Sequence, residues 1–145
     1  MSEIILSDDK ALLDVPRIHG RLASSYWSPG IAVDVVERAI AGSHCLGAYR
    51  DGVQVGFARM ITDHATFAWL ADVWVEESAR GQGLGKRIVA WFLDHPKFEG
   101  IRRFALATRD AHGVYASMGY HPLIEPSIYM ERLASDYADR LKARR

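Results

Sequence analysis

The chain is poor in cysteine, carries no net charge and has no long apolar run. Cys45 is its only cysteine, so no disulfide can form within the chain, which fits a reducing compartment. Lys plus Arg number 18 and Asp plus Glu also number 18, which gives a formal net charge of zero. Nucleic-acid and membrane-surface partners usually require a basic excess, so this balance disfavours both. The basic ending RLKARR is interpreted as a solvated helix end.

The signals that mark exported, membrane and metal-binding proteins are missing too. No apolar run approaches the roughly 18 residues of a membrane span, and the start MSEIILSDDK has no basic n-region. We therefore expect a cytoplasmic protein without a membrane partner. The histidines are scattered without metal-ligand spacing, so no metal is predicted. Cys45, in the apolar stretch CLGAY, is expected to be a buried hydrophobe rather than a catalytic thiol.

One domain over residues 1–145 is expected, because no repeat, linker or low-complexity segment interrupts the chain. Apolar spacing predicts helices over about 9–27, 31–42 and 84–95, and a short helix over 109–118 with Asp110 as N-cap. Runs rich in β-formers predict strands over 3–7, on both sides of Asp51-Gly52, and over 65–76, 101–108 and 127–133. This order predicts a mixed α/β fold in which an antiparallel meander leads into a β-α-β crossover.

Three alternating glycines stand in RGQGLGK, residues 80–86, between an apolar strand and a predicted helix. A P-loop would need glycine where Arg80 stands and Ser or Thr where Arg87 stands. A dinucleotide fold would need G-x-G-x-x-G after the first strand of a repeated βαβ array, which is absent here. Two interpretations remain. Either the free N–H groups of this loop hold a pyrophosphate at the helix N-terminus, or the loop is a plain tight turn.

The pattern Arg-x-x-Gly-x-Gly (Arg80, Gly83, Gly85), directly after DVWV, resembles the acetyl-CoA-binding motif of the GNAT N-acetyltransferase superfamily. Downstream, VYASMGY at 114–120 resembles that family's second motif, with Tyr115 at the usual position of the acid. TRDAHGVYASMGY is similar to one bacterial subgroup of small GNAT proteins. The resemblance covers most of the chain. It implies a mixed, mainly antiparallel central sheet, flanked by helices and splayed at an acetyl-CoA cleft.

By this resemblance, the backbone of Val73, Trp74 and Val75 pairs with the amides of the pantetheine arm. One of those N–H groups would polarise the thioester carbonyl. The residues implied to hold the pyrophosphate, through main-chain amides or added charge, are Arg80, Gly81, Gln82, Gly83, Gly85 and Lys86. Many family members carry Asn seven residues before the tyrosine to hold the coenzyme arm. This chain has Thr108 there, whose side chain is shorter.

The resemblance implies that Tyr115 protonates the departing thiolate, for which a phenol with a pKa of about 10 is suited. A packed aromatic is the structural alternative. The general base is left open. Some family members use a Glu on the central strand, where this chain has Trp69. Asp72 on the same strand, His112 on the helical face of Tyr115, and a water chain are the candidates, with structural or solvent-exposed roles as alternatives.

Tyr26 and Trp27, in SSYWSPG, are expected to wall the acceptor pocket, with Phe67 and Trp69 lining the same cavity; core packing is the alternative. The expected activity is direct acetyl transfer from acetyl-CoA to an unidentified primary amine in a ternary complex. A non-catalytic acyl-CoA sensor on the same fold is one alternative, and a partner-binding protein with structural glycines is another. Family relatives are often dimers, so the C-terminal strand and helix are candidate contacts of a homodimer.

Overall fold

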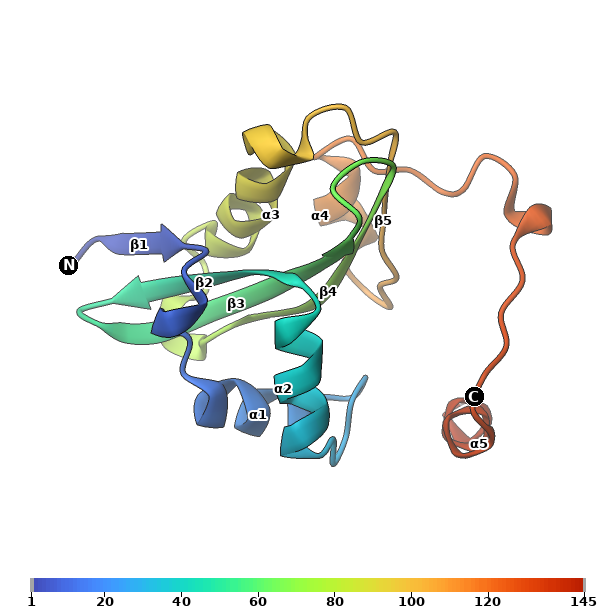
Figure 1. Ribbon diagram of the computed structural model, residues 1–145, viewed down its shortest axis with the longest axis horizontal. Coiled ribbons are helices and arrows are strands. Elements are labelled where there is room, and N and C mark those ends of the chain that lie inside the picture. Colours follow the sequence, from blue (N-terminus) through green and yellow to red (C-terminus); the bar gives the residue numbers. More distant parts are fainter. Residues whose placement is uncertain (1, 145) are drawn as a thin grey trace.

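Five strands form one sheet in the order β1-β2-β3-β4-β5 (Figure 1). The computed structural model describes residues 2–144. The strands are β1 (Ile4–Ser7), β2 (His44–Arg50), β3 (Val53–Thr62), β4 (Phe67–Val75) and β5 (Arg103–Ala105). The first four pair antiparallel, whereas β5 pairs parallel with β4. The predicted meander followed by a parallel crossover is confirmed.

Helices cover both faces of this sheet (Figure 1). They are α1 (Val15–Ala23), α2 (Val33–Ala41), α3 (Leu84–Asp94) and α4 (His112–Ala116), whereas α5 (Ser135–Ala143) lies apart from the sheet. Ile18 of α1 and Val36 of α2 pack with Phe57 in one buried cluster. Ile88 and Phe92 of α3 pack with sheet residues in a second cluster on the opposite face. Within residues 2–144, each helix is too short or too polar to cross a membrane.

The β2–β3 hairpin turns at Asp51 and Gly52, whose φ angles are 52° and 78°. Positive φ at both central residues is the requirement of a type I′ turn, and Asp-Gly meets it. Side-chain hydrogen bonds shorten the helix predicted over 9–27, and the prediction is wrong for its first residues. Asp9 and Asp14 each accept a nearby backbone N–H, from Ala11 and Arg17 respectively, so a short 3-10 turn forms first and α1 starts only at Val15.

Two predictions near the C-terminus are wrong. α4 begins at His112, and its N-cap is Ala111, without a side-chain cap, so Asp110 is not the N-cap. The Thr108 hydroxyl accepts the Ala111 N–H at 3.1 Å just before the helix. The strand predicted over 127–133 is not formed. Residues 126–128 make a 3-10 turn, and the chain then runs extended to α5 without pairing to any strand among residues 2–144. An extended run counts as a strand only when its backbone groups find a ladder partner.

β4 and β5 separate part-way along their length. They pair at three positions, Phe67 with Arg103, Ala68 with Phe104 and Trp69 with Ala105. β5 then ends, whereas β4 continues to Val75. The far half of β4 is therefore left without a neighbouring strand on that edge, where an extended ligand could pair with the main chain. This is the splay that the resemblance implied.

Candidate functional site

The glycine loop leads from the free half of β4 into α3. Gly81 and Gly83 have φ angles of 77° and 73°, in the region that favours glycine, and Gly83 is the N-cap of α3. Gly85 differs, because it lies inside the first helical turn. Apart from its chain neighbours and the backbone of its own helix, no atom lies within 4 Å of the position that a Cβ on Gly85 would take. Neither the backbone nor protein packing therefore requires glycine there, although glycine costs helix stability. A ligand approaching the main chain would require it.

Charged side chains anchor this loop at both ends. Glu76, which follows β4, accepts hydrogen bonds from Arg17 and Arg21 of α1 at 2.8–2.9 Å. Burial alone raises the pKa of Glu76, but the bonds and charges of Arg21 and Arg17 outweigh it and lower the pKa overall. Arg80 Nε donates to the Val75 carbonyl at 3.1 Å, and Arg50 donates to the side chain of Gln82 at 2.9 Å.

This arrangement places four cations, Arg50, Arg80, Lys86 and Arg87, on or beside a loop whose helix presents unpaired N–H groups. The sequence motif identified Arg80 and Lys86. Arg50 was missed, because it reaches the loop only through the pairing of the β2–β3 hairpin with the rest of the sheet. The loop can hold a diphosphate by main-chain donors, dipole and charge together.

Tyr115 lies half-buried on α4, edge-on to Tyr120 with ring centroids 5.7 Å apart. Burial raises the pKa of Tyr115, and the nearby phenol of Tyr26 raises it further. The phenol therefore keeps its proton at neutral pH and can act as a donor. Tyr26, which acts on the predicted acid in this way, is one of the four aromatics predicted for the acceptor site.

Three arginines hold the loop of Tyr26 and Trp27. The guanidinium carbon of Arg109 lies 4.6 Å from the centroid of the Tyr26 ring. Arg144 of α5 donates to the Tyr26 carbonyl at 2.9 Å, and Arg140 donates to the Trp27 carbonyl at 3.3 Å. Arg144 is exposed at the end of α5, as the interpretation of RLKARR as a solvated helix end predicts, whereas Arg140 is half-buried against this loop. Sequence reasoning missed all three, since their contacts join segments far apart in the chain.

Asp72 lies on a bulge of β4, with a φ angle of 56°. The register shifts here: Ala68 and Leu70 face the α3 side before the bulge, whereas Val73 and Val75 face it afterwards. Asp72 Oδ1 accepts the indole N–H of Trp27 at 2.9 Å, and Oδ2 accepts Arg59 Nε at 2.6 Å. With both oxygens occupied, the geometry favours the structural role that the sequence left open.

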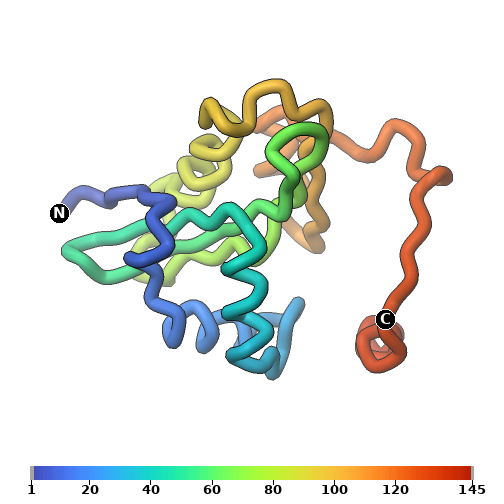
Figure 2. Tube along the Cα trace, in the orientation of Figure 1, coloured from blue at the N-terminus to red at the C-terminus, as the bar shows by residue number. Residues whose placement is uncertain are grey.

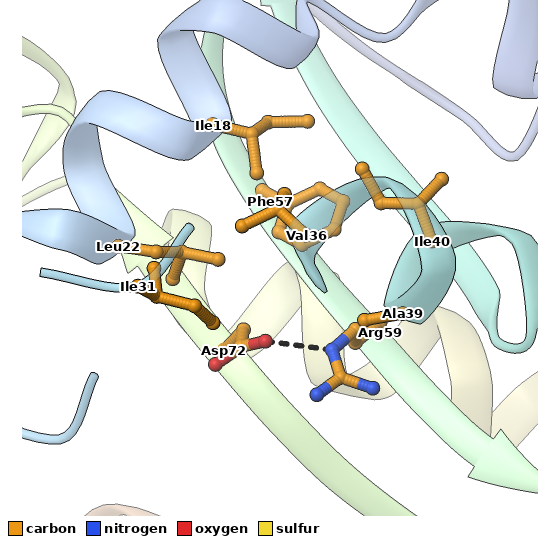
Figure 3. A pocket seen from close by; sticks show the side chains of 9 residues that line it. All are labelled: Ile18, Leu22, Ile31, Val36, Ala39, Ile40, Phe57, Arg59 and Asp72. Carbon is orange, nitrogen blue, oxygen red and sulfur yellow. Dashed lines mark hydrogen bonds and ion pairs between the residues drawn. The ribbon is translucent and has the colours of Figure 1, made fainter. Parts of the chain in front are cut away.

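Figure 3 shows the surroundings of this ion pair, which borders a cavity of about 10 Å³ between α1, α2 and the sheet. The other lining residues are Ile18, Leu22, Ile31, Val36, Ala39, Ile40 and Phe57. The walls are apolar apart from Arg59 and Asp72, and the volume holds about one water molecule. This cavity is a packing defect and offers no room for an acceptor.

The remaining predicted residues lie on β4, on the loop after β5 and on α4. Val73 and Val75 face α3, whereas Trp74 is buried toward α1 and α2. Trp69 stands at the last β4–β5 pair, where the strands part. Thr108 is half-buried and accepts the Ala111 N–H before α4, and His112 is exposed, without a side-chain hydrogen bond among residues 2–144.

Phe67 is not brought to Tyr26 and Trp27. It lies at the opposite end of β4 from the glycine loop, where it borders a separate hollow of about 350 Å³ with Thr66, Arg102 and Arg103. Within the described residues, no group of three or more His, Cys, Asp or Glu side chains could hold a metal ion. Cys45 is buried, and burial raises its pKa to about 11.

Comparisons with known proteins agree with this geometry. A model of the acetyltransferase (GNAT) family matches residues 15–120. An inferred acetyltransferase of Gibberella zeae is 31% identical over 133 residues, which cover 74% of this chain and 73% of that protein. The crystal structure of an inferred GNAT-family acetyltransferase from Xanthomonas campestris pv. campestris is 44% identical. It superimposes with a TM-score of 0.89 over 92% of this chain and 95% of that chain.

A more distant structure, an inferred acetyltransferase of Clostridium acetobutylicum solved with acetyl-CoA, shares the fold at 15% identity. Its TM-score is 0.67 over 92% of this chain and 96% of that chain. The family model spans most of this chain and includes β4, the glycine loop and α4. The chain therefore belongs to the acetyltransferase (GNAT) family.

Proposed function

We propose that this protein transfers an acetyl group from acetyl-CoA to a primary amine, directly and in a ternary complex. The observation that carries the proposal is Gly85, a helical glycine that neither backbone strain nor packing requires. Close approach of a diphosphate to the amides of Gly83, Gly85 and Lys86 would account for it. The acetyl-CoA bound to the Clostridium protein belongs to that protein, but its shared fold supports the same ligand here.

The free edge of β4 supports the position of the pantetheine arm. Val73, Trp74 and Val75 continue beyond the last β4–β5 pair, so their main-chain groups can bind the amides of the arm as a strand would. Val73 and Val75 pack on the α3 side, so the edge is held rigid from one face. One N–H of this edge would then lie against the thioester carbonyl and stabilise the oxyanion.

Tyr115 is assigned the acid. In the transfer, the amine nitrogen bonds to the thioester carbon, the carbon–sulfur bond breaks, and the sulfur takes its proton from the phenol. The nitrogen then sheds its second proton, which restores the phenol. The ammonium proton must leave before attack, because –NH₃⁺ has no lone pair. His112 and a water chain are the candidates for receiving it. Asp72 is assigned the orientation of Trp27, since both of its oxygens already accept hydrogen bonds.

The loop is tested with Gly85→Glu against Gly20→Glu. Both glycines are helical with open space at the Cβ position, but Gly20 lies in α1, away from the loop. Calorimetric titration with CoA should show at least a tenfold loss of affinity for Gly85→Glu, about 1.4 kcal/mol, and none for Gly20→Glu. Equal affinity in the two variants would remove the loop from the mechanism.

Thiol release from acetyl-CoA, measured over a panel of primary amines, tests the reaction itself. Turnover with any amine supports the transferase. Binding of CoA that depends on Gly85, without turnover over the whole panel, would instead favour the acyl-CoA sensor. If CoA neither binds nor raises the melting temperature, the glycines are structural; a native-state ligand at 100 times its Kd should add about 2.7 kcal/mol.

A further inference from the structure

The loop between α1 and α2 (residues 24–32, named the aromatic loop) connects the two sides of the opening in the sheet (Figures 1 and 2). Trp27 donates its indole N–H at 2.9 Å to Asp72, which lies on the part of β4 beyond its last pair with β5. Tyr26 contacts the other side, since the guanidinium carbon of Arg109, on the chain between β5 and α4, lies 4.6 Å from its ring centroid. The two aromatics therefore link β4 to the segment that follows β5.

The guanidinium of Arg109 is held by the Tyr26 ring but has no acceptor for its N–H groups. A cation–π contact attracts the guanidinium through its charge and uses none of its donors as hydrogen bonds to oxygen. Arg109 is exposed, and its side chain forms no ion pair or hydrogen bond to oxygen with any of residues 2–144. Its five N–H groups are thus available to a ligand beside the aromatic loop.

The oxygens of this region already accept hydrogen bonds. The carbonyls of Tyr26 and Trp27 accept from Arg144 and Arg140, at 2.9 and 3.3 Å. Both carboxylate oxygens of Asp72 are occupied as well. Donors are left over, because Nε of Arg140 is buried without a partner among residues 2–144. A ligand that carries only ammonium groups would meet guanidinium charges here, whereas an anionic ligand supplies the acceptor that these donors lack.

The chemistry of one guanidinium favours a carboxylate as that anion. The planar N–H groups of arginine match the two oxygens of a carboxylate, with which they form two parallel bonds. A carboxylate carries one charge, as does the side chain of Arg109, whereas a phosphate monoester carries nearly two. The ring of Tyr26 also holds the guanidinium in place before the ligand arrives, which reduces the entropy that binding costs.

We propose that the acceptor is a primary amine that carries a carboxylate, and that Arg109, held on the Tyr26 ring, binds this carboxylate. The inference rests on the proposed acetyl transfer and names the class of its acceptor, the amino acids and related amino carboxylates. Binding of the carboxylate beside the segment after β5 fixes one end of the acceptor and orients its amino group toward the thioester proposed at β4. Arg109 is then a specificity-determining residue with no part in proton transfer.

The first test measures thiol release from acetyl-CoA with pairs of amines that differ by one carboxylate. The pairs are leucine and 3-methylbutylamine, phenylalanine and phenethylamine, lysine and 1,5-diaminopentane, and 5-aminopentanoate and pentylamine. At least one carboxylate-bearing member should have a kcat/KM ten or more times that of its partner. Because the members of a pair also differ in basicity, the same ratio is then measured in variants, where the difference in basicity cancels.

Arg109→Gln removes the charge, and Arg109→Lys keeps the charge but not the planar set of donors. Arg103→Gln is the matched control, because Arg103 is also exposed and lies 5.6 Å from the ring centroid of Tyr129, but stands at the pair with Phe67, where β4 and β5 are still joined. Arg109→Gln should raise the KM of the preferred amino carboxylate at least tenfold and change kcat/KM of its partner less than twofold. Arg109→Lys should fall between, and Arg103→Gln should match the wild type.

A binding measurement separates this inference from the transferase itself. Protein saturated with CoA is titrated calorimetrically with the N-acetyl derivatives of the same pairs, which report carboxylate recognition without turnover. If no amine is acetylated but an N-acetyl acid binds, at least tenfold more weakly to Arg109→Gln, the transferase fails and carboxylate recognition stands. If only amines without a carboxylate are acetylated, or the preference for the acid survives Arg109→Gln, the transferase stands and this inference is overturned. Failure of every acid in both measurements overturns it too.

Discussion

Trp27 donates its indole N–H to Asp72 at 2.9 Å, across 45 positions of the sequence. This bond joins the loop after α1 to the bulge of β4. Arg59 Nε, from β3, donates to the other oxygen of Asp72 at 2.6 Å. The Asp72 side chain is only 9% exposed and that of Arg59 17%, so this ion pair is largely shielded from water. Trp27 is thus positioned by a carboxylate that the sheet itself holds.

Replacing Asp72 by Asn should reduce stability more than chemistry. The amide oxygen can still accept from Trp27, but Arg59 loses its counter-charge, and a buried ion deprived of its partner costs about 3 kcal/mol. Urea unfolding should show this loss, with kcat changed less than tenfold. A kcat lowered by several orders of magnitude at unchanged stability would make Asp72 the general base.

Removing the Tyr115 hydroxyl should stop turnover without weakening coenzyme binding. Loss of a general acid costs about 10²–10⁴ in rate. Because burial holds the pKa of Tyr115 above 10, the deficit of Tyr115→Phe should persist across the neutral range. Steady-state kinetics should show kcat falling while the KM for acetyl-CoA stays constant.

Tyr120→Phe is the matched control. Tyr120 stands edge-on to Tyr115, and its own hydroxyl is buried without a hydrogen-bond partner among residues 2–144. Removing that hydroxyl should leave kcat unchanged and unfolding free energy equal or higher. If both variants lost the same activity, packing rather than proton donation would explain the effect.

Removing the contact between the end of α5 and the loop of Tyr26 and Trp27 should weaken binding of the acceptor amine alone. Arg144→Ala removes a hydrogen bond to the Tyr26 carbonyl, a loss of about 1 kcal/mol or roughly fivefold. The KM for the amine should rise by that factor, with CoA affinity unchanged. Lys142→Ala, on the same helix, provides the comparison, and an equal effect of both variants would point to the helix rather than the contact.

Stability should decline in mild acid because of His44. Burial lowers the pKa of His44 below 6.5. The hydrogen bond and charge of Asp8 oppose this shift, whereas the charges of His64 and His95 add to it. The ring bonds to Asp8 at 2.9 Å and to His64 at 2.8 Å. A histidine with a depressed folded pKa binds its proton more readily when unfolded, so its contribution is complete above pH 6.5 and is lost as the pH falls.

Urea midpoints measured between pH 7.5 and 5 should therefore fall, and the decline should flatten in His44→Gln. His121→Gln serves as the control, since the one hydrogen bond of that ring within residues 2–144 is with the carbonyl of its neighbour Pro122. A slope unaffected by His44→Gln would assign the acid sensitivity to other groups.

Local signals predicted much of this fold. Asp51-Gly52 predicted the hairpin, and Pro96 the end of α3, because turn and cap chemistry acts over a few residues. The glycine loop was predicted by its motif. The register shift at Asp72 was not predicted, since a bulge depends on both strands. Arg59, Arg109 and Arg144 could not be assigned either, because their partners become neighbours only after folding.

The failed strand over 127–133 has a different cause. Its alternating residues fit a strand, but a strand also needs a neighbouring strand to pair with. The sequence alone does not show whether the fold places one beside it. The same limit applies to Phe67, whose apolar neighbours resemble those of Trp69 in sequence. The position of the β4–β5 divergence separates the two residues, one at the closed end and one where the strands part.

The left-handed backbone of Asp72 sets a rule for redesign. At a φ of 56° glycine, asparagine, aspartate and histidine are favoured over other residues, so most members of a library randomised at this position should be less stable. Tyr26, 42% exposed and on an ordinary backbone, carries no such restriction. Variants designed to accept a wider range of amines should therefore change Tyr26 and keep Asp72.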